Sequence, residues 1–291
     1  MIKAGKERTP YLFISPLILF VVLLILVPIV GSIITGFYRD VTFLRLKFIF
    51  LDNYAQLMKD EGFWRSMKFT LLFIAVAVPL EMIIGTAFAI VLDMKLPVRG
   101  FLRTCVLIPW VIPSAISAKI WQLIYDYSYG FANFLITAFH LGRPVNWIGT
   151  DIGAFFAIVI ADVWKTASFV ALLVLAGLQA VPSDLRLQAK VDRANFVQTF
   201  FYITLPLLKP VLLVTLLFRT IDSLRIFDVI YVLTGGGPGG ATTSVSLYAY
   251  KYFLGGDFGY GSAVSVLLFV VAFVMSYFYV KMSRFQGESG L

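Results

Sequence analysis

The stretch that decides the fold is VPSDLRLQAKVDRANFVQTFFYITLPLLKP, residues 181–210, a polar segment between two long apolar runs. Apolar residues recur in it at spacings of three and four, the period of one face of an α-helix. These residues are Leu187, Val191, Ala194, Val197 and Phe201. Ser183 suits the N-cap position of such a helix. We therefore predict one short amphipathic helix over 183–201, which lies outside a bilayer and docks on a partner.

The rest of the chain is too apolar for a soluble fold. Of its 291 residues, 60% are hydrophobic and only 14% are charged. A membrane-spanning helix needs about 20 apolar residues, and six runs reach that length. They lie near 11–37, 69–92, 103–125, 153–179, 203–232 and 261–282. A spanning segment must satisfy its own backbone hydrogen bonds, and these runs lack the alternation of barrel strands.

This pattern predicts an all-α transmembrane fold. We expect a six-helix polytopic bundle that forms a single transmembrane domain over 1–291, with the docking helix between spans four and five. Lys and Arg gather on the side of the bilayer that also holds the N-terminus, which predicts cytoplasmic N- and C-termini in a multi-pass cell membrane protein. The residues assigned to this side are Lys3, Lys6, Arg8, Lys95, Arg99, Arg103, Arg186, Lys190, Arg193, Lys281 and Arg284. The net charge of +8 is spread over short loops, which disfavours nucleic acid as a partner.

The third apolar run is interrupted by Pro109 and Pro113. A proline inside a helix removes one hydrogen-bond donor and bends the chain. The sequence leaves two interpretations open, a hinge that moves during function and a static kink.

Catalysis on this chain is not indicated. The glycine-rich TGGGPGG, residues 234–240, lacks the Lys and Ser or Thr of a phosphate-binding loop, so we exclude nucleotide binding. The sole histidine, His140, and the sole cysteine, Cys105, belong to no metal-binding or hydrolytic motif. We expect neither a catalytic residue nor a metal site, and no cofactor on this chain.

Polar residues inside the apolar runs are the candidate binding site, because charges there are expensive and usually face a cavity or a partner. In the fifth run four residues share one helical face: Arg219, Asp222, Ser223 and Ile226. Arg219 and Asp222 can pair along that helix, and Arg225 and Asp228 can repeat the pair one turn later. The alternative is that such charges only lock helices together.

The fourth run carries a second polar cluster over two turns, made of Asp162, Trp164, Lys165, Thr166 and Phe169. Glu81 stands alone in the second run, and helix locking is its favoured interpretation. Hydrogen-bonding groups beside flat apolar rings suit a hydroxyl-rich solute such as a sugar.

Residues 181–210 resemble the cytoplasmic EAA-loop signature of the permeases of binding-protein-dependent ABC importers, approximately I-P-x-x-L-Y-E-A-A-x-x-D-G-A followed by I-T-L-P. The matching residues are Val181, Pro182, Leu185, Ala189, Asp192, Ala194 and the run 203–206. Further similar segments are FLDNYAQLM at 50–58, LIPWVIPSAISAKIW at 107–121, LAGLQAVP at 175–182 and FDVIYVLTGGGPGGATT at 227–243. Together they are similar to the carbohydrate branch of that family.

The resemblance implies a type I importer and its partners. These are a second homologous permease, two cytoplasmic ATPase subunits that bind ATP and Mg, and an extracytoplasmic solute-binding protein. It implies that ATPase coupling falls on Leu185, Leu187, Ala189, Lys190, Asp192, Arg193 and Ala194. By position, it implies that substrate binding falls on Lys165, Thr166, Phe169, Arg219, Asp222, Ser223 and Ile226.

The signature departs from the family at three positions. Leu187 replaces its Glu, Gln188 its first Ala, and Arg193 its Gly. Docking is therefore expected to rely more on apolar contact, with Arg193 pairing with an acidic group of the ATPase. Two rival hypotheses remain. One is a secondary transporter driven by an ion gradient, with Glu81 or Asp162 as proton carrier. The other is a purely structural or receptor-like membrane subunit, which leaves the polar face inside the spans without a use.

Overall fold

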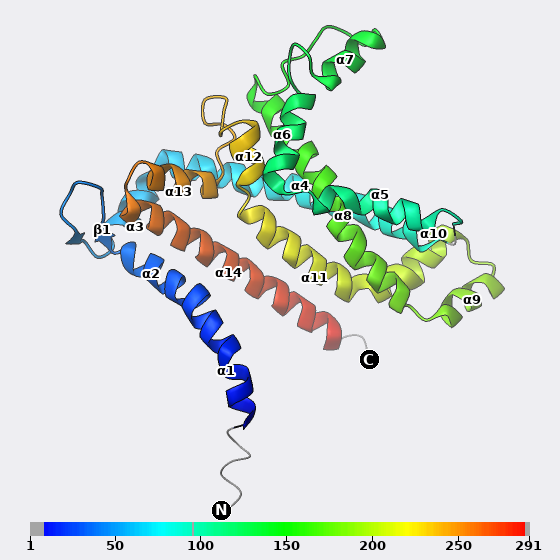
Figure 1. Cartoon of the computed structure of the whole chain (residues 1–291). Coiled ribbons are helices and arrows are strands. Elements are labelled where there is room, and N and C mark those ends of the chain that lie inside the picture. The colour runs from blue at the N-terminus through cyan, green and yellow to red at the C-terminus, as the bar shows by residue number, and fades with distance from the viewer. Residues whose placement is uncertain (1–8, 95, 289–291) are drawn as a thin grey trace, which may run out of the picture. The chain divides into compact units, whose positions relative to one another are not determined.

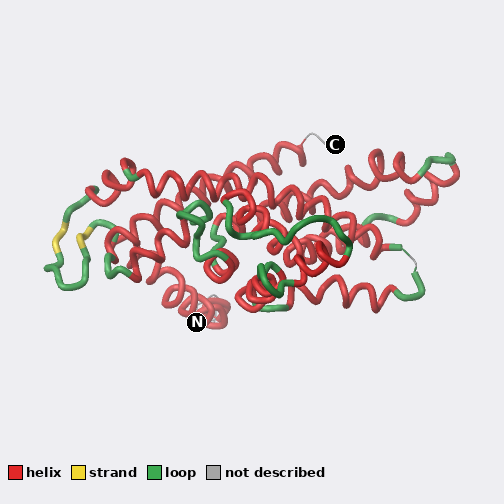
Figure 2. Tube along the Cα trace, turned by 90° about the horizontal axis from the view of Figure 1, so that it is seen from above, coloured by secondary structure: helices red, strands yellow, loops and turns green. Residues whose placement is uncertain are grey.

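The computed structural model describes residues 9–94 and 96–288, without the side chains of residues 9, 10, 12, 186, 190 and 282–288. Figure 2 shows that helices make up most of this part of the chain, joined by short loops. Five of the described helices are long and apolar enough to cross a membrane, or six if a bent pair counts as one span. The predicted all-α transmembrane fold is confirmed. The chain forms two compact units, residues up to 63 with 248–270, and residues 64–247 with those from 271 onward. The single domain stays a prediction.

The first unit begins with a continuous helical span. It is made of α1 (Thr9–Val21), the π-helical segment η1 (Val22–Leu26) and α2 (Val27–Thr35). A hairpin of two short strands, β1 (Tyr38–Arg39) and β2 (Lys47–Phe48), follows, then α3 (Asp52–Lys59). The side chain of Asn53 links α3 to the segment from the end of α2 to the start of β1. Its amide donates to the backbone carbonyls of Gly36 and Tyr38, at 2.9 Å each. The loop at 38–66 is thus partly helical, as predicted, and the strands are an addition.

The longest span, α4 (Glu61–Asp93), begins about two turns before the predicted start at residue 69. The bounds of the last two spans also differ from the predicted ones. The predicted run 203–232 is divided into α11 (Leu205–Leu224) and α12 (Asp228–Leu233), and α14 (Phe258–Glu288) follows the short α13 (Val245–Leu254). Figure 1 shows this order of elements along the chain. The fifth span ends at Leu224 because Arg225 leaves helical geometry, which the hydrophobic pattern alone does not reveal.

The third apolar run is two helices, α5 (Arg99–Val111) and α6 (Ser114–Ile124), bent by 97°. Ile112 is extended, with φ −66° and ψ 130°, and Pro113 follows it. A residue before proline avoids the helical region, and proline has no N–H to donate, so the sequence itself ends α5 here. The described part of the outer loop that follows contains a further short helix, α7 (Phe131–Ala138).

The central helix of the second unit is α8 (Asp151–Ala180), which packs against α5, α6, α11 and α12. In the most apolar 18-residue stretch of α8, 72% is buried inside the protein, against 28% in the corresponding stretch of α4. Small residues allow this close packing: a Cβ on Gly85 of α4 would lie 2.5 Å from Cβ of Val170, and one on Gly177 would meet Leu208 at 2.9 Å. The side chains of α8 therefore face other helices, which makes it the element most able to position a buried site.

Asp60, between α3 and α4, is the polar centre of the first unit. Its carboxylate accepts hydrogen bonds from the hydroxyl of Tyr248, from Tyr260 at 2.6 Å and from the N–H of Gly62 at 2.8 Å. Burial acts to raise the pKa of the carboxyl, but the tyrosine and backbone hydrogen bonds outweigh it, and the pKa lies below its ordinary value.

We predict that Asp60→Asn lowers the melting temperature by a few degrees and removes one acid-dependent part of stability. Because the folded-state pKa of Asp60 is depressed, the stability it contributes is present above about pH 4 and is lost as pH falls through the folded-state value. Thermal unfolding of the purified protein between pH 3 and about pH 6 checks this. An unchanged pH profile in the variant would contradict it, and the exposed Asp52→Asn is the matched control.

Candidate substrate cavity and coupling segment

The second unit contains a cavity of about 770 Å³ between α5, α6, α8, α11 and α12. Its polar lining includes five of the fourth- and fifth-run residues that the sequence singled out: Asp162, Lys165, Thr166, Arg219 and Asp222. Its apolar lining is Trp110, Phe169, Phe218, Ile221, Ile226, Phe227 and Val229. The tertiary structure therefore joins the two polar clusters, as the sequence analysis expected.

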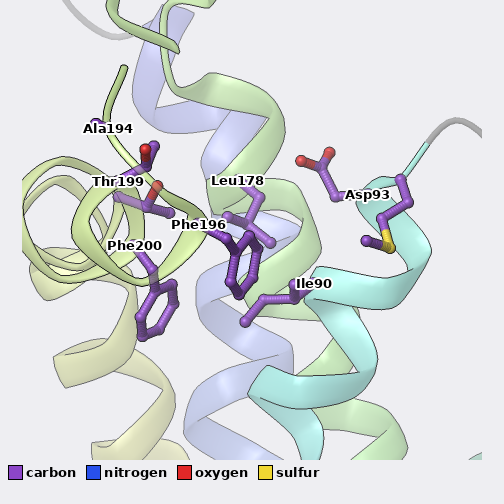
Figure 3. Close-up of a pocket in the computed structure, with 9 residues that line it drawn as sticks. Ile90, Asp93, Leu178, Ala194, Phe196, Thr199 and Phe200 are labelled. Carbon is purple, nitrogen blue, oxygen red and sulfur yellow. The ribbon is translucent and has the colours of Figure 1, made fainter. Parts of the chain in front are cut away.

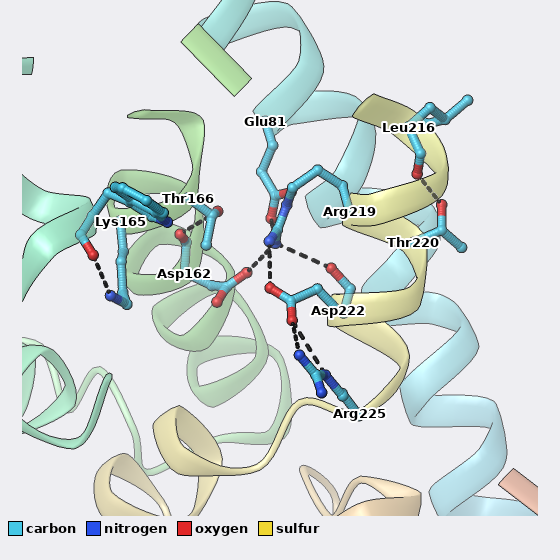
Figure 4. A network of polar contacts seen from close by, with 11 residues as sticks. Glu81, Asp162, Lys165, Thr166, Leu216, Arg219, Thr220, Asp222 and Arg225 are labelled. Carbon is cyan, nitrogen blue, oxygen red and sulfur yellow. Dashed lines mark hydrogen bonds and ion pairs between the residues drawn. The ribbon is translucent and has the colours of Figure 1, made fainter. Parts of the chain in front are cut away.

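Arg219 is the centre of the polar network in Figure 4. Its Nε and Nη2 donate to the two carboxylate oxygens of Glu81 at 2.6 and 3.1 Å. Nη1 donates to Asp222 at 2.8 Å, and Nη2 also reaches Ser223 at 3.3 Å. Asp162 completes the group with an ion pair at 3.6 Å. The guanidinium thus connects α4, α8 and α11 through charge-assisted contacts.

The pair between Arg219 and Glu81 lies out of contact with solvent, since the two side chains are 4% and 0% exposed. An isolated charge at such a site costs several kcal/mol, whereas a bidentate pair with its hydrogen bonds filled is tolerated. Helix locking, the favoured interpretation of Glu81, agrees with this contact. The sequence could not pair the two residues, because they lie 138 positions apart.

Asp222 differs from the other carboxylates of the network because its side chain is 50% exposed. One of its oxygens holds Arg219 and the other accepts from Arg225 Nη2 at 2.9 Å. The predicted pair between Arg225 and Asp228 is therefore wrong. Since α11 ends at Leu224, Arg225 and Asp228 no longer share a helical face, and Arg225 turns back to Asp222.

Lys165 points away from this network. Its ammonium donates to the backbone carbonyls of Trp110 at 3.1 Å and Ile112 at 2.5 Å, at the corner between α5 and α6. Phe169, one turn further along α8, packs against Trp110 with ring centroids 5.8 Å apart. These rings give the cavity lining a flat apolar part in addition to its carboxylates.

The remaining predicted residues hold supporting positions. The hydroxyl of Thr166 donates to the carbonyl of Asp162 at 2.6 Å. Ser223 is not among the residues that line the cavity but accepts a hydrogen bond from Arg219, whereas Ile226 lines the cavity beyond the end of α11. Sequence reasoning missed Trp110, Ser114, Phe218, Ile221, Phe227 and Val229 as lining residues. The proline-bounded motif at 109–113 was the available signal for Trp110, because it indicated a break in the third span at this residue.

The predicted single docking helix over 183–201 is wrong. The segment forms α9 (Ser183–Val191) and α10 (Phe196–Thr199), with a turn between them. Arg193 is left-handed at φ 57°, and the N–H of Ala194 donates back to the carbonyl of Ala189 at 2.9 Å, which closes α9. The stripe of five apolar residues is therefore divided between separate helices.

Two signals for this break were present in the sequence. Arg193 occupies the family's Gly position, and Gly is favoured where φ is positive. Asn195 and Gln198 form a capping box that starts α10, with reciprocal bonds of 2.8 and 2.9 Å. Helix α10 continues into the π-helical segment η2 (Phe200–Thr204) and then α11.

The predicted coupling residues are divided between exposed and covered positions. Leu187, Asp192 and Arg193 are exposed, Leu185 and Ala194 are half-buried, and Ala189 is buried. The side chain of Lys190 lies outside the described residues. Leu187 and Val191 are 58% and 82% exposed, so α9 presents an uncovered apolar pair one turn apart.

A second cavity, of about 450 Å³, lies beside the coupling segment, the predicted ATPase-docking stretch at residues 183–201. Figure 3 shows Phe196, Phe200, Leu178 and Ile90 converging on it, with Asp93 at one side. Apolar side chains dominate its lining, and it separates the start of α10 from the end of α4.

The sequence matches the family described as binding-protein-dependent transport system inner membrane component over residues 81–284. That stretch contains the whole Arg219 network and the coupling segment. The chain belongs to this family. It is a membrane-spanning permease subunit of an ABC importer, which is a transport component and not a catalytic one.

Individual relatives agree with the family. The chain is 51% identical to the trehalose/maltose transport system permease protein MalF of Thermococcus litoralis, over 99% of this chain and 97% of that protein. It is 35% identical to the trehalose transport system permease protein SugA of Mycobacterium tuberculosis, over 96% and 90%. A bacterial ABC transporter that imports the acidic polysaccharide alginate shares the fold, with a TM-score of 0.84, 24% identity and 96% of each chain covered.

We predict that Glu81→Ala destabilises the protein by about 3–5 kcal/mol, because it leaves the buried Arg219 without its bidentate partner. Glu81→Gln, which keeps the shape and one acceptor, is expected to cost less. Denaturant or thermal unfolding in detergent measures both variants, and Glu61→Gln at an exposed position is the control. Equal stability of Glu81→Ala and wild type would refute the locking role.

Proposed function

We propose that this chain forms half of the translocation pathway of an ATP-driven importer of a di- or oligosaccharide. The observation that carries the proposal is the cavity of the second unit, whose lining combines the packed rings of Trp110 and Phe169 with the half-exposed Asp222. Sugars combine hydroxyls with flat apolar faces, and such a lining with a few oriented polar groups suits them. The names of relatives such as the trehalose/maltose permease support the same class of solute.

The proposed partners follow the family. One of two ATPase subunits docks at α9, where the exposed Leu187 and Val191 offer an apolar contact and Arg193 a positive charge, and the other docks on the partner permease. A second homologous permease completes the pathway, and a solute-binding protein delivers the sugar on the outer side. ATP and Mg belong to the ATPase subunits, and this chain carries no cofactor. The distribution of Lys and Arg supports cytoplasmic N- and C-termini in the cell membrane.

A gradient-driven carrier is the less favoured mechanism. Glu81, one of its two candidate proton carriers, is held by two hydrogen bonds to Arg219. Such a carrier also has no use for the docking pair on α9. Co-purification of the chain with an ATPase, and sugar uptake into vesicles that requires ATP, test the importer. Uptake that follows an ion gradient without ATP would overturn it.

We predict that Asp222→Ala raises the sugar concentration for half-maximal uptake by about 10-fold or more, because it removes a carboxylate acceptor at the cavity surface. Sugar-stimulated ATPase activity of the assembled transporter should shift in parallel. Asp151→Asn, at the exposed start of α8, is the control and should leave both unchanged. Unchanged uptake kinetics in Asp222→Ala would remove Asp222 from the proposed site.

We predict that Arg193→Glu uncouples ATP hydrolysis from transport, because it places a negative charge where an acidic group of the ATPase is expected. Arg193→Gly separates charge from conformation, since glycine adopts the left-handed φ of 57° without strain. The ratio of ATP hydrolysed to sugar transported measures coupling. The ratio should rise in the Glu variant and much less in the Gly variant. A wild-type ratio in Arg193→Glu would contradict the docking contact.

A further inference from the structure

The corner between α5 and α6 leaves backbone carbonyls without their usual helical partners. In a continuous helix the carbonyls of Trp110 and Ile112 would accept from residues four positions ahead. The extended Ile112 and the 97° change of direction remove those partners. Unpaired carbonyls inside a membrane protein are costly because no water is there to bond them, so the corner requires a donor from elsewhere in the fold.

Lys165 of α8 supplies that donor. Its ammonium bonds both carbonyls, at 3.1 and 2.5 Å, and the residue is only 8% exposed. In Figure 4 the side chain runs away from Arg219 and toward the neighbouring backbone. The end of α5 also carries the negative pole of its helix, which favours a cation at this position.

The need is mutual. A buried ammonium is costly unless its protons are accepted, and two of the three protons of Lys165 are accepted by the corner. The corner in turn is satisfied by a residue of the most buried span. Helices α5 and α6 both pack on α8 as well. Opening the corner would break two hydrogen bonds to a charged group and expose the charge to an apolar environment.

We infer that Lys165 makes the corner a fixed joint, so that α5, α6 and α8 move as one body during transport. This chooses the static kink over the hinge, the two alternatives left open by Pro109 and Pro113. Lys165 is then a positioning residue: it holds the carbonyl of Trp110, and thereby the ring that packs on Phe169 at the cavity wall. It does not bind the sugar itself, and in this respect the inference refines the proposed function on which its transport measurements rest.

The joint can be measured directly with two spin labels. Phe101 near the start of α5 and Leu123 near the end of α6 are 71% and 51% exposed, which makes both suitable for labelled cysteines in a Cys105→Ser background. Each lies about 15 Å from the corner at 1.5 Å per residue, so a 97° bend puts their backbones roughly 20 Å apart. Opening the corner by about 30° would lengthen this to roughly 25 Å, a change that pulsed electron resonance resolves.

The wild-type protein should give the same narrow distance distribution at rest and after trapping the assembled transporter with ATP and vanadate. A shift of about 5 Å on trapping would make the corner a hinge and overturn the inference. The distance measurements on the resting protein and on the variants below need neither sugar nor ATPase. A chain that fails to import sugar would therefore defeat the proposed function and leave the test of the joint intact.

Lys165→Met removes both hydrogen bonds while keeping the length of the side chain. We expect it to broaden the distance distribution and to raise the sugar concentration for half-maximal uptake more than it lowers the maximal rate. Lys165→Arg can donate to both carbonyls and should restore the narrow distribution. Lys119→Met is the matched control, because Lys119 of α6 bonds to Gln122 of its own helix, at 2.6 Å.

Two outcomes oppose the inference. If Lys165→Met weakens sugar binding with an unchanged distance distribution, Lys165 is a substrate ligand and does not hold the corner. If Lys165→Arg stays as broad as Lys165→Met, the two carbonyl contacts do not hold the corner. Should Lys165→Met fail to assemble, the wild-type comparison and Lys165→Arg still decide the question.

Discussion

The buried contact between Arg219 and Glu81 is the constraint on which the second unit depends. A guanidinium with almost no exposure must be matched by a carboxylate in the same layer of the bundle, and the match determines how α4 and α11 face each other. Asp162 and Ser223 fill the positions around it, from α8 and α11. Once this centre is in place, only Asp222 of the carboxylates contacting Arg219 turns substantially toward open space. The network therefore both locks the helices and presents one acceptor to the cavity.

Helix α8 supplies further buried polar contacts of the second unit. Its small and apolar residues let neighbouring helices approach closely, while its two polar turns face different partners. Asp162 contributes to the Arg219 centre, and Lys165 satisfies the broken end of α5. A lysine in a membrane span is commonly interpreted as a substrate ligand or as part of an ion pathway. Here backbone geometry gives it a different use, because a bent span needs a donor as much as a buried cation needs acceptors.

The coupling segment shows how a local backbone preference changes an amphipathic pattern. The spacing of Leu187, Val191 and Val197 suits one helix, yet Arg193 adopts a left-handed conformation and the chain restarts at Asn195. The result is a short helix with an uncovered apolar pair, followed by a capped turn that enters the fifth span through a π-helical segment. A π-helical insertion is often found near functional positions, and this one borders the second cavity.

The sequence by itself determined the membrane class, the number of apolar runs, the polar segment at 181–210 between two of them and the helical face that carries Arg219 and Asp222. These features depend on composition and on periods of three to four residues, which are local. The pairing of Arg219 with Glu81, the bonds from Lys165 to the corner and the end of α11 at Leu224 were decided only by the tertiary structure. Each depends on groups that are distant in sequence, or on a departure from helical geometry that hydrophobicity does not encode. A charged residue in a span indicates that a partner is required, but only the packed helices determine which partner is within reach.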